Sequence, residues 1–451
     1  MSLPYLLPML LLYTLIYSPC AAVDTGSCPE GMLAISTDET GESHRLLTEA
    51  VHAGGAKCAA QLWQGSAIAF PARVYEPSET VLPAALYPAL NGKDLVVPPM
   101  TKEEILDEGK VDLVVMARAN LADAEFCNKA ASGREDEIVY CIGCCQGCFD
   151  PHMNPANLLN DTHITCLRNP ALGKEKEYAF VKTDSPKTVL IAGGGMGGME
   201  AAYRLHMLGH KVILCEAAGV LGGQFILAGE SPRKGEFKKA TADCARRLTR
   251  LGVEVRLNAP VDAALIESVK PDCVIIATGA EPIRLSLPGA ELKPVYNSHD
   301  VLAHRAVPEG RVCIIGGGMV GLETAEFAAA LGCKVTVVEM QGQLAADMGY
   351  LRKLCTLSAM AEEGIEAIVN ARCKAINGTG VIAERDGEEL TIPCDTVVTA
   401  VGARSKPCDE LKAACERLSI KYYVIGDAVQ ARRALNATAE GAAVAYEINK
   451  A

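Results

Sequence analysis

The sequence repeats itself at an offset of 123 residues, and this duplication restricts the fold more than any other feature. Residues 189–200 read VLIAGGGMGGME, and residues 312–323 read VCIIGGGMVGLE. The match continues to Glu216 and Glu339, each 18 residues after the last glycine of its motif. A Rossmann unit typically has this order: an apolar run, a glycine-rich turn, a helical pattern and a second apolar run that ends in an acid. We therefore predict an α/β protein with two Rossmann-like dinucleotide-binding domains.

Each glycine of the repeated motif has its own physical role. The first allows a tight turn, the second lets the backbone approach a pyrophosphate, and the third lets the helix pack closely on the strand. The helix N-terminus offers free N–H groups to the phosphates, and the acid binds the ribose hydroxyls. These positions are Gly193, Gly195, Gly198 and Glu216 in the first copy, and Gly316, Gly318, Gly321 and Glu339 in the second.

The segments after each repeat identify a larger arrangement. A Leu-Gly-Gly-Gln run follows the first copy, apolar runs at 273–279 and 396–402 predict further strands, and Gly-Asp precedes a final helix. This order resembles the flavoproteins with two dinucleotide-binding domains, over residues 187–451. The resemblance implies an FAD domain at 185–305 and 404–451 and an inserted NAD(P)H domain at 306–403. It also implies FAD contacts from Gly223, Gln224, Thr278, Gly279, Gly426 and Asp427, besides the first-copy glycines and Glu216.

The second copy also bears on the choice of nicotinamide cofactor. An acid at Glu339 repels the 2′-phosphate of NADPH, and neither Met340 nor Gln341 offers a cation to bind it. We therefore expect NADH, which would pass a hydride to FAD.

Upstream of the repeats lies a run of closely spaced cysteines. Cys141, Cys144, Cys148 and the later Cys166 form a C-x2-C-x3-C pattern with a distant fourth thiol. Four thiolates suit a [4Fe–4S] cluster, and zinc is the structural alternative. Cys145 is a spare thiol beside these ligands. The chain has 19 cysteines, an odd number in a long sequence, so we predict a reducing, cytoplasmic location rather than a disulfide scaffold.

With these motifs the whole chain resembles the iron–sulfur NADH:flavin oxidoreductases related to old yellow enzyme, such as 2,4-dienoyl-CoA reductase. Members join an FMN-binding TIM barrel, a [4Fe–4S] cluster and an FAD/NAD(P) module, and many reduce activated C=C bonds. The cluster would occupy residues 141–184. The resemblance implies barrel-like strands near residues 12–24, at 57–63 with Gln61 and at 111–118 with Arg118, the last two residues matching FMN contacts.

Residues 1–140 are too few for the complete barrel that this resemblance implies. A TIM barrel needs about 250 residues, so we expect a truncated remnant with a join near residues 101–105 and little or no FMN. No catalytic residue can be assigned. The apolar run at residues 3–22 has two interpretations, a secretory signal or a strand. We favour the strand because the run matches a strand of the barrel.

Composition limits the partners. A net charge of −12 argues against nucleic acid, which needs a basic surface, and we expect no membrane span. The expected partner is a small-molecule substrate or electron acceptor, and a homo-oligomer is compatible with the sequence. The favoured function is transfer of hydride from NADH to FAD and of electrons on to the cluster. The alternatives are a diaphorase that reduces dyes or quinones, and a remnant or partner subunit without turnover.

Overall fold

The computed structural model describes residues 15–22, 33–34, 57–63, 80–82, 95–97, 116–153 and 163–450. The chain divides into two compact units, Met1–Val115 and Met116–Ala451. Each unit is described by itself below.

The first unit contains two small groups of strands. Strand β1 (Leu15–Ala22) pairs in parallel with β2 (Leu33–Ala34) and with β3 (Lys57–Trp63). Strand β4 (Thr80–Leu82) pairs antiparallel with β5 (Leu95–Val97).

Two of these strands test the predictions from the sequence. The strand predicted at residues 57–63 is confirmed as β3, which contains Gln61. Residues 15–22 of the apolar N-terminal run also form a strand, β1. The predicted join near residues 101–105 lies outside the described residues.

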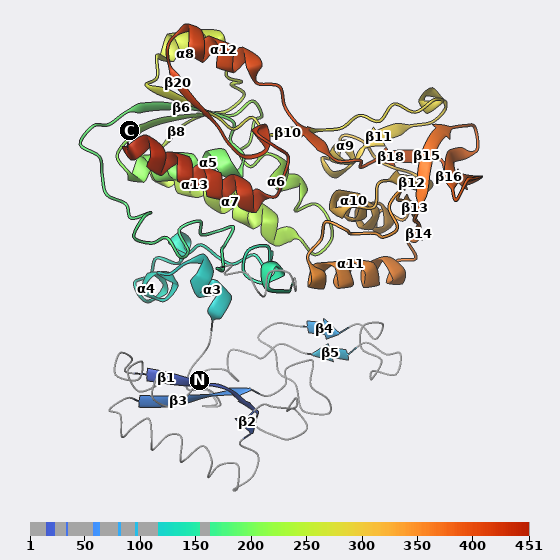
Figure 1. The fold of residues 1–451 in the computed structure, drawn as a ribbon, viewed down its shortest axis with the longest axis horizontal. Helices are drawn as coiled ribbons and strands as arrows, with labels where there is room; N and C mark the ends of the chain where they lie inside the picture. Colours follow the sequence, from blue (N-terminus) through green and yellow to red (C-terminus); the bar gives the residue numbers. More distant parts are fainter. Residues whose placement is uncertain are drawn as a thin grey trace. The chain divides into compact units, whose positions relative to one another are not determined.

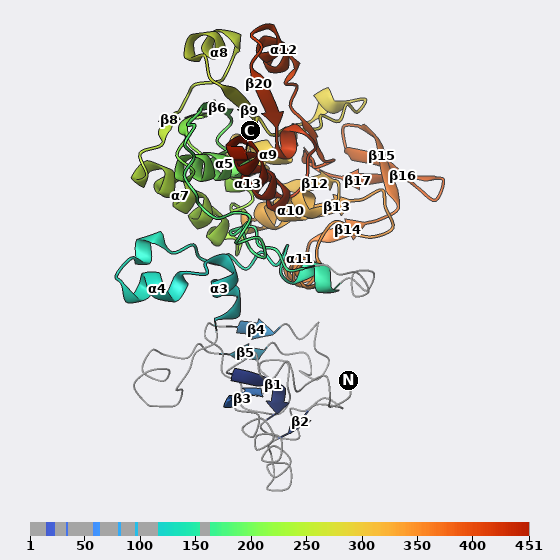
Figure 2. The ribbon, with the colours of Figure 1, turned by 60° about the vertical axis from the view of Figure 1, so that its left-hand side comes forward.

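A five-stranded parallel sheet forms the first Rossmann domain of the second unit (Figures 1 and 2). Its strands, in spatial order, are β20 (Lys421–Val424), β9 (Cys273–Ile276), β6 (Thr188–Ala192), β7 (Lys211–Cys215) and β8 (Glu254–Arg256). The first apolar run of the repeat lies at the centre of this sheet as β6, and its continuation is β7. Both strands predicted from the first copy are therefore confirmed.

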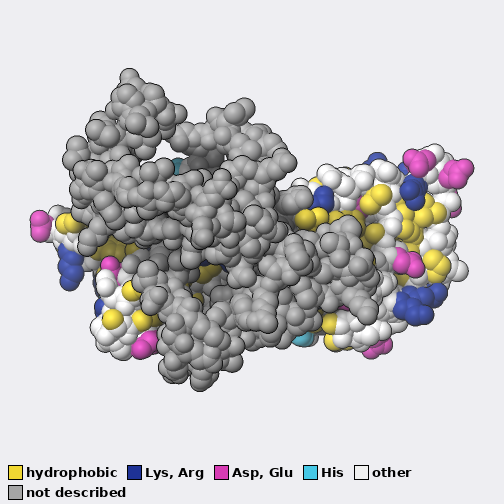
Figure 3. Space-filling model, turned by 90° about the horizontal axis from the view of Figure 1, so that it is seen from below, with side chains coloured by type: hydrophobic (Ala, Val, Ile, Leu, Met, Phe, Trp, Pro, Cys, Tyr) yellow, Lys and Arg dark blue, Asp and Glu magenta, His cyan; other side chains and the backbone are white. Residues whose placement is uncertain are grey.

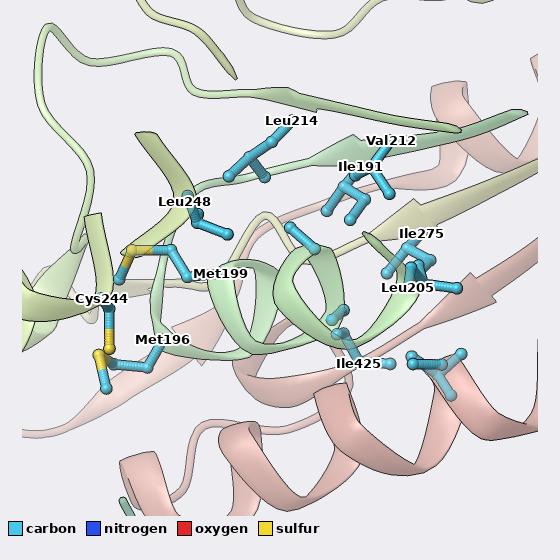
Figure 4. Packing of buried hydrophobic residues seen from close by; sticks show 14 of the residues in the cluster. Ile191, Met196, Met199, Leu205, Val212, Leu214, Cys244, Leu248, Ile275 and Ile425 are labelled. Atoms are coloured by element: carbon cyan, nitrogen blue, oxygen red, sulfur yellow. The ribbon is translucent and has the colours of Figure 1, made fainter. Parts of the chain in front are cut away.

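Helices cover both faces of this sheet because successive strand residues point to opposite sides. Ile191 and Leu214 face one layer, and Leu190 and Ile213 face the other. Figure 4 shows Met199 and Leu205 of a helix in one hydrophobic cluster with Ile191 and Leu214 of the sheet. The first layer consists of α5 (Met196–Met207), α6 (Gln224–Leu227), α7 (Gly235–Arg250) and α13 (Ala434–Lys450), and the second of α8 (Ala263–Val269) and α12 (Asp409–Arg417).

Glycines bring the first helix of this domain into very close contact with the last. A Cβ built on Gly441 would lie 2.3 Å from the carbonyl oxygen of Gly197, and one on Gly197 would lie 2.9 Å from that of Ala437. The chain's C-terminal helix, α13, therefore packs backbone to backbone on α5. This contact holds residues 426–437 beside the glycine-rich turn of the first repeat.

A second five-stranded parallel sheet carries the second repeat. Its strands, in spatial order, are β11 (Val295–Asn297), β18 (Thr396–Thr399), β12 (Arg311–Ile315), β13 (Lys334–Val338) and β14 (Glu366–Ile368). The helices α9 (Ser298–Leu302), α10 (Met319–Ala330) and α11 (Tyr350–Glu362) pack on one face. An antiparallel sheet covers the other face, made of β15 (Ala371–Ile376), β16 (Gly380–Arg385) and β17 (Glu388–Pro393).

The two Rossmann domains are joined by a pair of crossing strands. Strand β10 (Ala280–Pro282) pairs antiparallel with β19 (Ala403–Ser405), so the chain enters and leaves the second domain side by side. Because β11 joins the second sheet, that sheet begins before residue 306, the boundary expected from the sequence. The short 3-10 helix η8 (Ala290–Leu292) lies between the crossing and this sheet.

The cysteine segment is preceded by two short helices, α3 (Ala117–Ala122) and α4 (Phe126–Ala131), and a 3-10 turn, η5 (Glu135–Glu137). The expected strand at 111–118 is therefore wrong at its end, because Ala117 and Arg118 lie in α3. Residues 111–115 lie outside the described residues. Ala and Arg are strong helix formers, and residues 116–122 contain no β-branched side chain to favour a strand.

On the face seen in Figure 3, acidic and basic side chains are interspersed among apolar ones over the described part. No helix within the described residues combines the length and the apolar character that a membrane span requires.

Candidate functional site

The glycine-rich turn of the first repeat has the geometry that its sequence predicts. Gly193 has a φ of +116°, and its Cβ would lie 2.3 Å from the carbonyl oxygen of Ala277. A Cβ on Gly198 would lie 1.9 Å from the carbonyl oxygen of Gly193, so the helix can approach the strand only without one. A Cβ on Gly195 would meet nothing within 4 Å. The side of Gly195 is therefore open space in front of the helix N-terminus.

Glu216, at the end of β7, is held by the same turn. Its two carboxylate oxygens accept hydrogen bonds from the backbone N–H groups of Gly194 at 2.7 Å and Ala218 at 2.8 Å. These bonds fix the carboxylate at the rim of the open space, where a ribose would lie in a Rossmann unit.

The open space continues into one large cavity of about 960 Å³, at the upper end of the size of ligand sites. All ten residues expected to contact FAD line this cavity: Gly193, Gly195, Gly198, Glu216, Gly223, Gln224, Thr278, Gly279, Gly426 and Asp427. The predicted positions come from four separate stretches of sequence. The fold brings them together at the carboxyl ends of β6, β7, β9 and β20.

Several of these side chains are positioned for a polar ligand. Gln224 donates from Nε2 to the carbonyl oxygen of Ala280 at 2.6 Å, which fixes its amide. The hydroxyl of Thr278 is buried and has no hydrogen-bond partner. Burial raises the pKa of the Asp427 carboxyl, and the Arg432 N–H that donates to it at 3.0 Å opposes this shift. A buried hydroxyl without a partner costs free energy unless a ligand satisfies it.

Another residue that lines this cavity is not predicted by any sequence motif. Gln146 lies between Cys145 and Cys148, and its amide oxygen is buried without a hydrogen-bond partner. The spacing of the thiols defines the cysteine motif and predicts no role for the polar residue between them. Gln146 links the cysteine segment to the cavity of the first repeat.

The second repeat has an equivalent turn with a different neighbour. Gly316 has a φ of +112°, and a Cβ on Gly321 would lie 1.9 Å from the carbonyl oxygen of Gly316. Glu339 accepts from the N–H groups of Gly317 and Gln341, both at 2.7 Å. The different neighbour is Asp347, whose carboxylate lies at the N-terminus of α10.

The four residues expected to bind NADH are outside the large cavity. The following residues of α10, Met319, Val320 and Glu323, line it instead. The helix of the second repeat therefore extends from its own glycine turn to the cavity of the first.

An ion-pair network joins the two Rossmann domains beside this cavity. Lys234, from the loop before α7, pairs with Glu323 of α10. Arg352 of α11 also pairs with Glu323, at 3.3 Å. Burial lowers the pKa of Lys234, and the Glu323 carboxylate opposes that shift. Next to it, Arg233 pairs with Glu326 at 3.0 Å.

The cysteine segment lies close by within the same unit. All four expected ligands, Cys141, Cys144, Cys148 and Cys166, line one small cavity together with Cys145. Burial raises the pKa of the Cys144 thiol to about 11, with repulsion from the Cys166, Cys148 and Cys141 thiolates adding to it. The fold therefore gathers thiols that span 26 positions of the sequence.

The thiols of this segment are the soft donors that either a [4Fe–4S] cluster or a zinc ion would need. Among the described residues, no group of three or more His, Cys, Asp or Glu side chains is placed to hold one metal ion.

Arg118 and Cys145 meet at the edge of this small cavity. Arg118 is exposed, and its Nη1 lies 3.9 Å from the sulfur of Cys145. Cys145 itself has a φ of +56°, in the left-handed backbone region that residues other than glycine rarely adopt. Arg118 thus contacts the cysteine segment, whereas the family resemblance implies a contact with FMN.

Comparison with known proteins gives three similarities. Residues 187–441 match the family described as pyridine nucleotide-disulphide oxidoreductase. The chain is 33% identical over 345 residues to the bilirubin reductase of Mediterraneibacter gnavus (strain CC55_001C), covering 76% of this chain and 53% of that protein. It is 36% identical over 356 residues to the NADH oxidase of Thermoanaerobacter brockii, covering 78% and 54%.

A solved structure extends the likeness to most of the chain. The structure of 2-naphthoyl-CoA reductase with 2-naphthoyl-CoA matches with a TM-score of 0.72 and 27% identity, over 90% of this chain and 62% of that chain. The chain spans about half the length of the curated relatives it matches.

Proposed function

The chain belongs to the pyridine nucleotide-disulphide oxidoreductase family, and from this premise we propose that it passes reducing equivalents from NADH through FAD to a [4Fe–4S] cluster. The proposal rests chiefly on the cavity of about 960 Å³, which all ten residues expected to bind FAD line. A large cavity lined by glycine turns and a few convergent polar groups has the form that ligand sites take in α/β folds.

The residues of this cavity fit FAD in two independent respects. The space beside Gly195 is open and glycine adds no Cβ to it, so a pyrophosphate can approach the backbone there. The buried Thr278 hydroxyl offers a hydrogen bond that no protein group satisfies. FAD, when bound, supplies the hydride-accepting chemistry. The protein's part is to hold it between β6 and α13.

The second repeat supports NADH as the reductant. Glu339 presents a buried carboxylate at the end of β13, which would accept ribose hydroxyls and repel a 2′-phosphate. Met319 and Val320, which begin α10, line the cavity of the first repeat. A dinucleotide bound along α10 would therefore reach the FAD site with its nicotinamide end.

The cysteine segment supports an electron acceptor beside FAD. Cys141, Cys144, Cys148 and Cys166 would hold the cluster, and Gln146 in the same segment faces the FAD cavity. A cluster there would carry one electron at a time. Thiolate ligands need a reducing compartment, so we place the protein in the cytoplasm.

The relatives are named for different reactions, so the final acceptor is proposed separately. The relatives named above are a bilirubin reductase, an NADH oxidase and a 2-naphthoyl-CoA reductase, and the chain covers 53%, 54% and 62% of their lengths. We propose that this chain reduces a dye or quinone with NADH and does not by itself reduce a conjugated enoyl-CoA. FMN forms no part of the proposal.

The proposal is tested by anaerobic titration of the purified protein with NADH. Bleaching of the visible flavin absorbance, followed by dye reduction, is the expected result. A protein that binds flavin but is not bleached by NADH would refute the proposed reductant. Turnover of a dienoyl-CoA by this chain alone would refute the proposed class of acceptor.

A pair of glycine variants ties that activity to the cavity. Gly195 has a φ of −71° and no neighbour within 4 Å of a Cβ, so Gly195→Val should fold normally. Its side chain would occupy the pyrophosphate position and lower FAD affinity by at least about tenfold, which is about 1.4 kcal/mol. Gly378→Val, in a turn where a Cβ also meets nothing, is the control and should keep its FAD.

A further inference from the structure

The two repeats can be compared residue by residue, because adding 123 to a position in the first gives its counterpart in the second. The N–H of Gly222 donates to the carbonyl oxygen of Gly194 at 2.8 Å. The counterpart bond runs from Ala345 to Gly317 at 2.9 Å. The segment after the second strand therefore crosses the glycine turn in the same way in both repeats.

The repeats diverge two residues later. Gln224 begins α6, and its side chain turns away to donate to the carbonyl oxygen of Ala280 at 2.6 Å. Its counterpart is Asp347, whose carboxylate turns toward the glycine motif. The N–H of Met319, the first residue of α10, donates to both oxygens of Asp347, at 3.0 and 3.3 Å.

This difference changes what lies in front of the helix N-terminus. In the first repeat the space beside Gly195 is open and belongs to the large cavity. In the second repeat a Cβ on Gly318 would lie 3.5 Å from an Asp347 oxygen. An anionic side chain therefore occupies the place where the N-terminus of a Rossmann helix receives a phosphate.

We propose that Asp347 competes with the dinucleotide for this position and thereby sets the affinity of the second repeat for NADH. The proposal rests on the proposed function, because it assumes that NADH binds along α10. The carboxylate of Asp347 and the pyrophosphate are both anions that need the N–H of Met319. Binding of the dinucleotide must therefore move Asp347 away.

The position of Asp347 suits a residue that moves aside. Asp347 is exposed, so its carboxylate can leave Met319 for water without becoming a buried charge. Its backbone carbonyl accepts a hydrogen bond from Arg433, which also lies 3.8 Å from Asp150 and lines the FAD cavity. The backbone is thus anchored to the FAD domain while the carboxylate is free to turn.

The test is equilibrium binding of ADP-ribose to the oxidised holoprotein by calorimetry. ADP-ribose carries the pyrophosphate but no nicotinamide, so it does not reduce the flavin. Asp347→Asn removes the competing charge at similar size and should lower the Kd by about two- to fivefold, the range expected for an exposed charge at a helix N-terminus. Adenosine, which has no phosphate, should bind both proteins equally.

Asp386→Asn is the matched control, because Asp386 is an exposed acid on the turn between β16 and β17 of the same domain. It should bind ADP-ribose like the wild type. Unchanged or weaker binding by Asp347→Asn would overturn the inference and leave the proposed function intact. If neither the wild type nor Asp347→Asn binds ADP-ribose, the proposed NADH site is itself refuted, and this inference with it.

Discussion

The guanidinium of Arg168 donates from Nη1 to the backbone carbonyl oxygen of Ala240, 3.2 Å away, and so joins the cysteine segment to helix α7. The same nitrogen lies 3.1 Å from the sulfur of Cys244, and Nε donates to the carbonyl oxygen of Tyr140 at 3.4 Å. Asp243 completes the set with an ion pair at 3.7 Å. One buried side chain thus connects the segment before the cysteines, the segment after them and the FAD domain.

Replacing Arg168 by Met should destabilise the protein by about 2 to 3 kcal/mol, because buried acceptors lose a charged donor. Thermal unfolding would measure this loss. The iron content should also fall, since Cys166 is two residues away. Arg246→Met is the control, because Arg246 pairs with the same Asp243 from an exposed position. A stability loss equal in the two variants would show that Arg168 has no special role.

The cysteine variants test the ligand assignment. Ser at Cys141, Cys144, Cys148 or Cys166 should abolish the cluster, since each would remove one of four soft ligands. Cys145→Ser should retain it, although Cys145 lines the same small cavity. Iron and sulfide analysis under anaerobic conditions gives the answer. Retention of the cluster in Cys144→Ser together with its loss in Cys145→Ser would reverse the assignment.

His210 should make stability depend on pH. The N–H of Lys187 donates to its Nδ1 at 3.1 Å, so that nitrogen must be unprotonated. Burial lowers the pKa of His210 below its ordinary value, while the Asn449 side chain opposes this shift. The unfolded chain therefore binds the proton more readily. The stabilisation that the neutral His210 side chain contributes is complete above about pH 6.5 and is lost as the pH falls below that value.

The variant His210→Gln should show this as a weaker pH dependence. Between about pH 7.5 and 5.5, the melting temperature of the wild type should fall more steeply than that of the variant. The corresponding difference in the free energy of unfolding is at most about 1.4 kcal/mol per pH unit. Melting curves at matched ionic strength measure the difference. Parallel curves for the two proteins would contradict the role assigned to His210.

The sequence was sufficient to predict the parts of the fold that repeat a local pattern. The strands β6, β7, β12 and β13 and their glycine turns follow from apolar runs and spacing, because each unit is assembled within about 30 residues. The convergence of the expected FAD residues on one cavity follows from the same order of elements.

Features that depend on distant packing could not be predicted in this way. Arg168 meets Ala240 across 72 positions, and Lys234 meets Glu323 across 89. No local pattern specifies such partners. Arg118 lies in a helix, as its local propensity favours, although the family resemblance implies a strand there. Asp347 lies eight residues beyond Glu339 and outside the repeated motif, so the repeat does not predict its role.

The choice between NADH and NADPH should depend on Glu339. Glu339→Ala removes the carboxylate that would bind the ribose and repel a 2′-phosphate. The preference for NADH, measured as the ratio of the two dissociation constants, should fall by about tenfold or more, equal to about 1.4 kcal/mol. Glu216→Ala, the counterpart in the first repeat, should lower FAD affinity without changing that ratio. An unchanged ratio in Glu339→Ala would refute this role.

The identity of the bound flavin tests the central claim most directly. Flavin released from the purified protein by acid and separated by chromatography should be FAD, at about one per chain, because one cavity contains every residue expected to bind it. Little or no FMN should accompany it. Stoichiometric FMN in place of FAD, or a protein that binds no flavin when FAD is supplied, would contradict the account.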